Sequence, residues 1–99
     1  MLNNYCYSAR SYASKRIEVI ELLLNAAKQG ANLLDKKIDY QLLIVFQNYL
    51  IAIMDSLTQK TNYNFSTMYM RFNVNIANYE PKVQVQKTVE FLISIVEKL

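Results

Sequence analysis

Histidine is absent from this 99-residue sequence, and cysteine, glycine and proline occur once each. Without histidine, the commonest general base and the usual partner of a nucleophilic serine or cysteine are missing, and zinc ligation by cysteine and histidine is excluded by count. The lone Gly30 cannot build a phosphate-binding loop, and Cys6 has no neighbour that would activate its thiol. Glu18 and Glu21 share one side of a helix, but no partner pair of acids follows. We therefore expect no enzyme activity, no cofactor and no metal site.

The scarcity of glycine and proline indicates few turns and long regular elements, which favours helices over the short strands of a sandwich or barrel. Ninety-nine residues suffice for one hydrophobic core, so we expect a single domain over residues 1–99. A single cysteine forms no intrachain disulfide and suits a reducing compartment. The N-terminus lacks the apolar run of a secretory signal. The sequence therefore predicts a cytoplasmic, all-α protein.

The net charge is +3, from eleven basic and eight acidic residues that are spread along the chain. No helix carries a basic stripe interleaved with aromatic side chains, which a nucleic-acid-binding surface would require. The excess of positive charge is compatible with weak attraction to an anionic surface. We expect no nucleic-acid partner. A binding or interaction protein is the class that remains, with peripheral membrane association left open.

The most conspicuous segment is Tyr40–Met54, fifteen residues without a charge. Asp35 or Asp39 is suited to cap it as a helix. Its apolar residues follow a helical period and continue around nearly the whole circumference, so the helix should need neighbours on several sides. The main face is Leu42, Phe46, Tyr49, Ile53 and Leu57, widened by Leu43, Leu50 and Met54. The remaining apolar residues, which extend around the helix, are Ile44, Val45, Ile51 and Ala52. At roughly 23 Å it is shorter than the ~30 Å hydrocarbon core of a membrane. We predict the central helix of a bundle, fading near Leu57, and no transmembrane span.

Before this segment the sequence predicts an irregular arm and one helix. Residues 1–11 lack periodicity, and we expect the tyrosines among them to lie against the bundle. A helix then begins at Ser11 or Ser14, either of which is a suitable N-cap. Its apolar seam is Ile17, Ile20, Leu24, Ala27, Ala31 and Leu34. Gly30 either ends this helix as its C′ residue or permits a close helix crossing, and the seam beyond it favours the crossing.

Two further helices are predicted after the polar residues 58–62. The third covers about residues 64–79, with Phe65, Met68, Phe72, Ile76 and Tyr79 on one face. Residues 72–76 also alternate as a strand would, but a lone strand would have no partner. Pro81 suits the first turn of a fourth helix, whose face is Val85, Val89, Leu92, Val96 and Leu99. Four amphipathic helices with short polar connections predict an antiparallel four-helix bundle.

Three segments are notable in combination. Tyr7-Ser8 precedes KRIEVI at residues 15–20 with Leu23 and Leu24, MRFNVNIAN occupies residues 70–78, and EFLISI occupies residues 90–95. In this order and at this chain length they resemble the arm and the first, third and last helices of the pediocin-like (class IIa) bacteriocin immunity proteins. Those proteins are cytoplasmic four-helix bundles. The connection at residues 58–63 is longer than is usual in that family, and the aromatic and glycine residues of its arm are replaced.

The resemblance implies a protein of lactic acid bacteria that confers resistance to an antimicrobial peptide. It would recognise the mannose phosphotransferase permease with bound bacteriocin from the cytosolic side, and keep the pore closed. Selectivity in that family is associated with the C-terminal half. The candidate partner-binding residues there are Arg71, Asn73, Asn75, Asn78 and Lys82. Asparagine is unfavourable inside a helix, so its repeated use supports a recognition face, with an ordinary solvated face as the alternative.

A second hypothesis is a small helical chaperone of flagellar or type III export. Ala26, Asp39 and Tyr40 resemble positions of flagellin chaperones. Such a protein should offer a long apolar groove to a client helix. An uncovered apolar stripe on the second or fourth helix would support this hypothesis, and a fully covered second helix would count against it.

Overall fold

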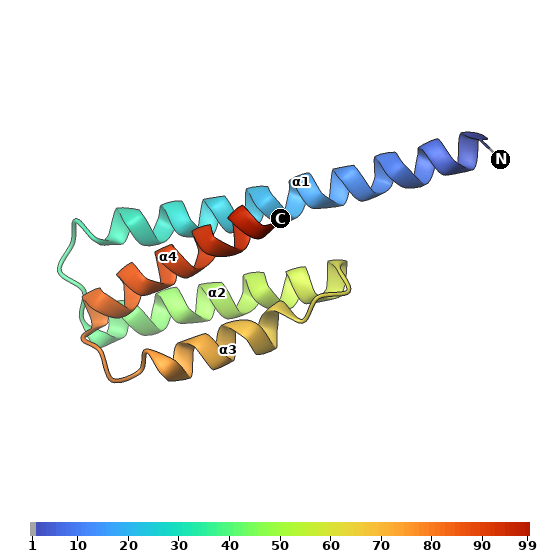
Figure 1. Cartoon of the computed structure of the whole chain (residues 1–99). Helices are drawn as coiled ribbons and strands as arrows, with labels where there is room; N and C mark the ends of the chain where they lie inside the picture. Colours follow the sequence, from blue (N-terminus) through green and yellow to red (C-terminus); the bar gives the residue numbers. More distant parts are fainter. Residues whose placement is uncertain (1) are drawn as a thin grey trace.

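The computed structural model describes residues 2–99, with side chains from Ala13 onward, and over this range it contains four helices and no strand (Figure 1). The helices are α1 (Leu2–Leu33), α2 (Tyr40–Lys60), α3 (Phe65–Asn75) and α4 (Pro81–Lys98). Successive helices run in opposite directions. The predicted all-α antiparallel four-helix bundle is confirmed. The strand considered for residues 72–76 is wrong, because Phe72 to Asn75 are helical and Ile76 caps the helix.

The irregular arm predicted for residues 1–11 is wrong from residue 2 onward, since α1 begins at Leu2 instead of at Ser11 or Ser14. The segment contains neither proline nor glycine, so nothing in its backbone chemistry interrupts a helix. The lack of apolar periodicity means that this segment has no apolar face suited to packing. Accordingly, α1 extends well past the ends of the other helices (Figure 1). The expected packing of the N-terminal tyrosines lies outside the described side chains.

The helix ends follow local side-chain chemistry. Of the two candidate caps for α2, Asp39 is the one used, and its Oδ1 accepts a hydrogen bond from the Leu42 backbone N–H at 2.8 Å. Asn64 caps α3 in the same way, accepting from Thr67 N–H at 3.0 Å. Pro81 opens α4, as predicted. The backbone N–H groups of the first helical turn have no carbonyl partner within the helix. The side-chain oxygen of the N-cap residue accepts a hydrogen bond from one of them.

Both middle helices end away from their predicted positions. α2 continues through Lys60, one turn beyond Leu57, while α3 stops at Asn75 instead of Tyr79. The turn after α3 is held by the buried Gln84, whose Nε2 donates to the Tyr79 carbonyl at 2.8 Å and to the Ala77 carbonyl at 3.4 Å. These side-chain bonds satisfy carbonyls that would otherwise need a continuing helix.

Gly30 lies inside α1, so the close helix crossing is confirmed and the C′ alternative is wrong. A Cβ atom at Gly30 would lie 2.7 Å from Val89 Cγ2 and 2.9 Å from Phe46 Cζ. Such distances are well inside van der Waals contact. Three helices therefore meet at Gly30 because it has no side chain.

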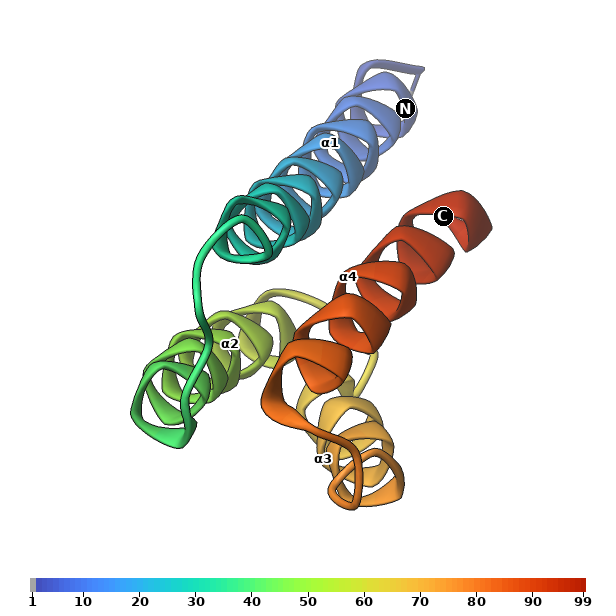
Figure 2. The ribbon, with the colours of Figure 1, turned by 90° about the vertical axis from the view of Figure 1, so that its left-hand side faces the viewer.

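The four helices share one core, in which α1 packs mainly against α4 and α2 mainly against α3 (Figure 2). The fully buried large side chains are Leu23, Leu50, Met54, Leu57, Tyr69, Val85 and Leu92. An exposed ion pair between Lys60 and Glu18 also joins the end of α2 to α1. Its contribution to stability is expected to be under about 1 kcal/mol because both groups are solvated.

The prediction that α2 is surrounded on several sides is wrong. Its buried residues are Leu43, Phe46, Leu50, Met54 and Leu57, all on one face. The opposite face leaves Tyr40 67 %, Ile44 53 %, Val45 64 % and Ile51 43 % exposed. Three other helices, two of them paired with each other, do not suffice to cover it. By length and composition α2 is the one helix in the described part of the chain that would suffice to cross a membrane.

Tyr69 of α3 is a core residue that the predicted face omitted. Its side chain is 1 % exposed, whereas the predicted core residue Met68 is 37 % exposed. The Tyr69 hydroxyl is buried without a hydrogen-bond partner. Burial raises the pKa of this phenol from 10.0 to about 12, because the charged phenolate loses its hydration.

Replacing Tyr69 by Phe is expected to stabilise the fold by about 1 to 2 kcal/mol, because it removes a buried hydroxyl that has no partner. The unfolded chain releases this proton near pH 10 and the folded chain near pH 12. The part of the free energy of unfolding that depends on protonation of Tyr69 is therefore fully present below pH 10. It is lost as the pH rises toward 12, by at most about 1.4 kcal/mol per pH unit. Urea denaturation of the parent and of Tyr69→Phe from neutral pH to pH 12 measures both effects. The exposed Tyr40→Phe is the control, and equal alkaline slopes in parent and Tyr69→Phe would contradict the assignment.

Candidate interaction surfaces

The first candidate surface is the outer side of α3. Arg71 and Asn75 are one turn apart and both are exposed. With Met70 and Val74 they line a shallow, open hollow. Met70 is 48 % and Val74 72 % exposed. A single helix face thus combines a guanidinium, an amide and two apolar side chains, the mixture that protein interfaces favour.

The other predicted site residues do not all join this surface. Asn73 is half-buried, and its Oδ1 accepts a hydrogen bond from Gln47 Nε2 of α2 at 3.3 Å. It therefore ties α3 to α2. Asn78 lies in the turn after α3 and Lys82 in the first turn of α4, and both are exposed. The structure brings Arg71 and Asn75 together, and assigns Asn73 a packing role.

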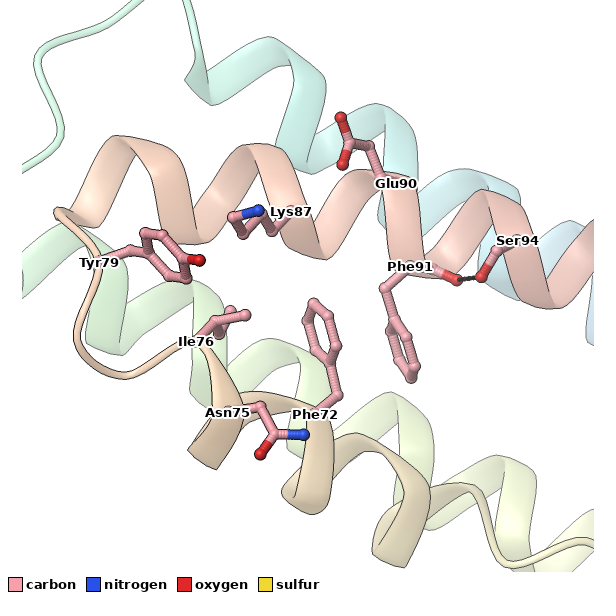
Figure 3. A pocket seen from close by; sticks show the side chains of 8 residues that line it. All are labelled: Phe72, Asn75, Ile76, Tyr79, Lys87, Glu90, Phe91 and Ser94. Atoms are coloured by element: carbon pink, nitrogen blue, oxygen red, sulfur yellow. Dashed lines mark hydrogen bonds between the residues drawn. The ribbon is translucent and has the colours of Figure 1, made fainter.

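An open groove of about 480 Å³ lies between α3 and α4 (Figure 3). Its apolar part is Ile76 and the stacked pair Phe72 and Phe91, whose ring centroids are 4.1 Å apart with planes inclined by 10°. At one end the Lys87 ammonium lies 4.7 Å from the centroid of the Tyr79 ring, a cation–π contact. The rest of the rim is polar and consists of Asn75, Glu90 and Ser94.

The side chains of this groove are already engaged with one another. Ser94 Oγ donates to the Phe91 carbonyl at 2.7 Å, and the two phenyl rings fill the contact between α3 and α4. Asn75 borders both the groove and the outer hollow of α3. The groove therefore extends the α3 surface toward α4, and its chemistry is that of contact and hydrogen bonding.

The charge on α3 itself is of one sign, and the acid among the groove residues is Glu90 of α4. Between Asp55 and Glu80 the sequence contains no acidic residue, and the charged residues there are Lys60 and Arg71. Arg71 presents a planar fork of N–H donors without a carboxylate on its own helix to neutralise it. The α3 surface is thus suited to a partner that offers apolar side chains beside a carboxylate or another anion.

Sequence reasoning missed the apolar half of this surface and the groove. Met70 and Val74 lie off the predicted core face at a spacing of four, which was an available signal of an outward apolar stripe. The Phe72–Phe91 stack had no such signal, because it joins side chains on two different helices, and no local pattern contains such a contact.

The second candidate surface is the exposed side of α2, here termed the α2 outer face. It consists of Tyr40, Gln41, Ile44, Val45, Asn48, Ile51, Ala52 and Asp55. All eight are exposed, and none between Tyr40 and Ala52 is charged. An exposed apolar patch of this kind commonly marks an interaction site.

No group of three or more Cys, Asp or Glu side chains within the part of the chain described is placed to hold a metal ion. Comparisons with protein-family models, with curated proteins and with solved structures found no match to this chain. Its surfaces are therefore interpreted from its own residues.

Proposed function

We propose that this protein is an interaction protein of the bacteriocin immunity type, which acts in the cytoplasm at the inner face of the membrane. The observation that carries the proposal is the outer side of α3, where Arg71 and Asn75 lie exposed beside Met70 and Val74. These four residues belong to the segment 70–78, whose sequence resembles the pediocin-like immunity proteins. The four-helix bundle agrees with that family's fold.

The proposed partner is the mannose phosphotransferase permease with bacteriocin bound. A protein that closes the pore only after the bacteriocin has engaged must bind the engaged state more tightly than the free permease. Arg71 supplies a directional bond to an anionic or carbonyl group, and Asn75 supplies both a donor and an acceptor. Met70 and Val74 supply apolar area around them. Each of these contacts favours the bacteriocin-bound permease over the free permease when the group that it binds is available only in the bound state.

The test is a protection assay in a sensitive lactic acid bacterium challenged with a panel of pediocin-like peptides. The parent is expected to raise the inhibitory concentration of at least one peptide. The double variant Arg71→Ala/Asn75→Ala is expected to return it to the level of cells without the protein, because loss of an anchoring arginine alone typically costs about 2 kcal/mol or more. Circular dichroism of the purified variant checks that the bundle remains folded.

The chain offers a matched control. Lys28 and Asn32 of α1 are also a cation and an asparagine one turn apart, and both are exposed. Lys28→Ala/Asn32→Ala is expected to protect as well as the parent. Protection that survives the α3 changes would place recognition elsewhere, and unchanged killing by every peptide, the cognate one included, would exclude the immunity function.

A second candidate function is the helical export chaperone, which the α2 outer face favours. A chaperone of this class is expected to leave an apolar stripe on its second or fourth helix uncovered. On α2 the exposed side chains of Ile44, Val45 and Ile51 form such a stripe. A chaperone would bind a client helix on this face with its apolar side inward. Titration of ¹⁵N-labelled protein with amphipathic helical peptides tests it, and shifts confined to α2 would support it.

A further inference from the structure

The α2 outer face is arranged symmetrically about Asn48. Ile44 and Val45 precede Asn48 by four and three residues, and Ile51 and Ala52 follow it by three and four. All four are exposed on the same side as Asn48. A half-turn about an axis through Asn48 and normal to the helix therefore exchanges one apolar pair with the other.

We infer that the α2 outer face binds a second copy of this chain, with the two α2 helices antiparallel about a two-fold axis at Asn48. In this arrangement Val45 lies opposite the second copy's Ile51, and Ile44 lies opposite its Ala52, so that a large side chain meets a small one. Gln41 and Asp55, seven residues on either side of Asn48, also meet, and the amide donates to the carboxylate. Two-fold interfaces require such self-complementary patches.

Asn48 favours a second copy over a purely apolar occupant of this face. Its side chain is exposed, and none of the side-chain hydrogen bonds found within residues 13–99 uses it. A purely apolar client helix or a lipid surface would bury this amide without a partner, at a cost in affinity. On the two-fold axis the two amides pair reciprocally, each donating to the carbonyl of the other. A central asparagine of this kind also fixes the register of two packed helices.

The charges at the two ends of the face also bear on self-association. Antiparallel pairing separates the two copies of Asp55 and brings each toward the N-terminus of the other copy's α2, where the helix dipole favours a carboxylate and the exposed Asp39 opposes it. The centre of the interface is free of charge, as interface cores usually are. One helix face offers less than the ~800 Å² per partner of a standard stable interface. We therefore expect a weak dimer, with a dissociation constant on the order of 10⁻⁵ to 10⁻³ M.

Sedimentation equilibrium from about 10 μM to about 1 mM tests the association. The apparent mass of the parent is expected to rise from 11.6 kDa toward twice that value. Val45→Lys, on the α2 outer face, is expected to stay at the mass of one chain. Val74→Lys is the matched control, because Val74 is a similarly exposed valine on α3, and it is expected to dimerise like the parent. Circular dichroism verifies equal helicity in all three.

A disulfide cross-link tests the axis itself. In a Cys6→Ser background, Asn48→Cys places the same residue of both copies on the axis. Two packed helices with axes about 8–10 Å apart leave facing Cα atoms roughly 3.4 to 5.4 Å apart, and the upper part of this range is within reach of a disulfide. Oxidation is expected to give a covalent dimer. Asn32→Cys, exposed on α1, is the control and is expected to cross-link only slowly, by random collision.

Several results would overturn the inference. The inference is wrong if the parent remains a single chain at about 1 mM, or if Val45→Lys dimerises like the parent. It is also wrong if Asn48→Cys cross-links no faster than Asn32→Cys. A chain that stays monomeric and instead floats with anionic vesicles, or binds an amphipathic helical peptide on α2, would assign the face to a membrane or to a client helix. The outcome does not depend on the immunity function, whose test uses the α3 surface.

Discussion

Leu50→Ala is expected to lower the free energy of unfolding by about 3 to 4 kcal/mol, the range for truncating a fully buried leucine. Leu50 is 0 % exposed in the centre of α2, so its removal both loses apolar burial and leaves a cavity. A domain of this size has roughly 5 to 15 kcal/mol of stability in total. The variant should therefore unfold at a much lower urea concentration, with little change in the denaturant slope.

The neighbouring Ile51 provides the matched control. It is as apolar as Leu50 but 43 % exposed, on the α2 outer face. Ile51→Ala is expected to change the stability by less than about 1 kcal/mol, because the small loss of burial is partly offset by the higher helix propensity of alanine. Both variants should be measured at low micromolar concentration, where association contributes least. Equal losses for the two would mean that α2 is buried on both sides.

Gly30→Val is the second substitution with a large expected effect, a destabilisation of about 3 kcal/mol. The first carbon of any side chain at Gly30 already meets Val89 Cγ2 at 2.7 Å and Phe46 Cζ at 2.9 Å. The valine adds two further methyl groups at a point where three helices meet, and overpacking of this kind costs about 1 to 3 kcal/mol or more. The gain in helix propensity over glycine is only about 0.4 kcal/mol. Thermal and urea denaturation both measure the loss.

Two further variants separate the clash from other effects. Lys28→Val places the same side chain at an exposed site of α1 and is expected to cost about 0.5 kcal/mol or less. Gly30→Ala combined with Val89→Ala should be less destabilised than the sum of the two single variants, by about 1 kcal/mol, because the shortened residue 89 makes room. Strict additivity, or a Gly30→Val protein as stable as the parent, would contradict the close crossing.

The bundle and the starts of its last three helices were predictable because apolar periodicity and N-terminal helix signals are local, whereas Ser11 and Ser14 do not mark the start of α1. Asp39, Asn64 and Pro81 mark helix starts that the structure contains. The end of α3 was less accessible, because it depends on Gln84 bonding to carbonyls in a turn five to seven residues earlier.

Exposure was harder to predict than helicity. Met68 and Tyr69 are adjacent apolar residues about 100° apart on a helix, and the pattern alone cannot decide which one faces the core. The same difficulty applies to α2, which has apolar residues nearly all round. Which of them are buried depends on how many helices pack against α2. Of the predicted site residues, Arg71 and Asn75 lie together on an exposed face, while Asn73 is engaged by Gln47, a contact between helices that no local pattern contains.

The crossing at Gly30 also determines how α1 is aligned along the bundle. If α1 slid by one turn, the position against Phe46 and Val89 would be taken by Ala26 or Ala27 in one direction and by Leu33 or Leu34 in the other. Even an alanine Cβ there would require the ends of the Val89 and Phe46 side chains to shift. An amphipathic helix with a regular seam could otherwise pack almost equally well in several shifted positions. Because the chain has a single glycine, one alignment of α1 lets the three helices meet without such shifts, so the missing side chain at residue 30 favours that alignment over its neighbours.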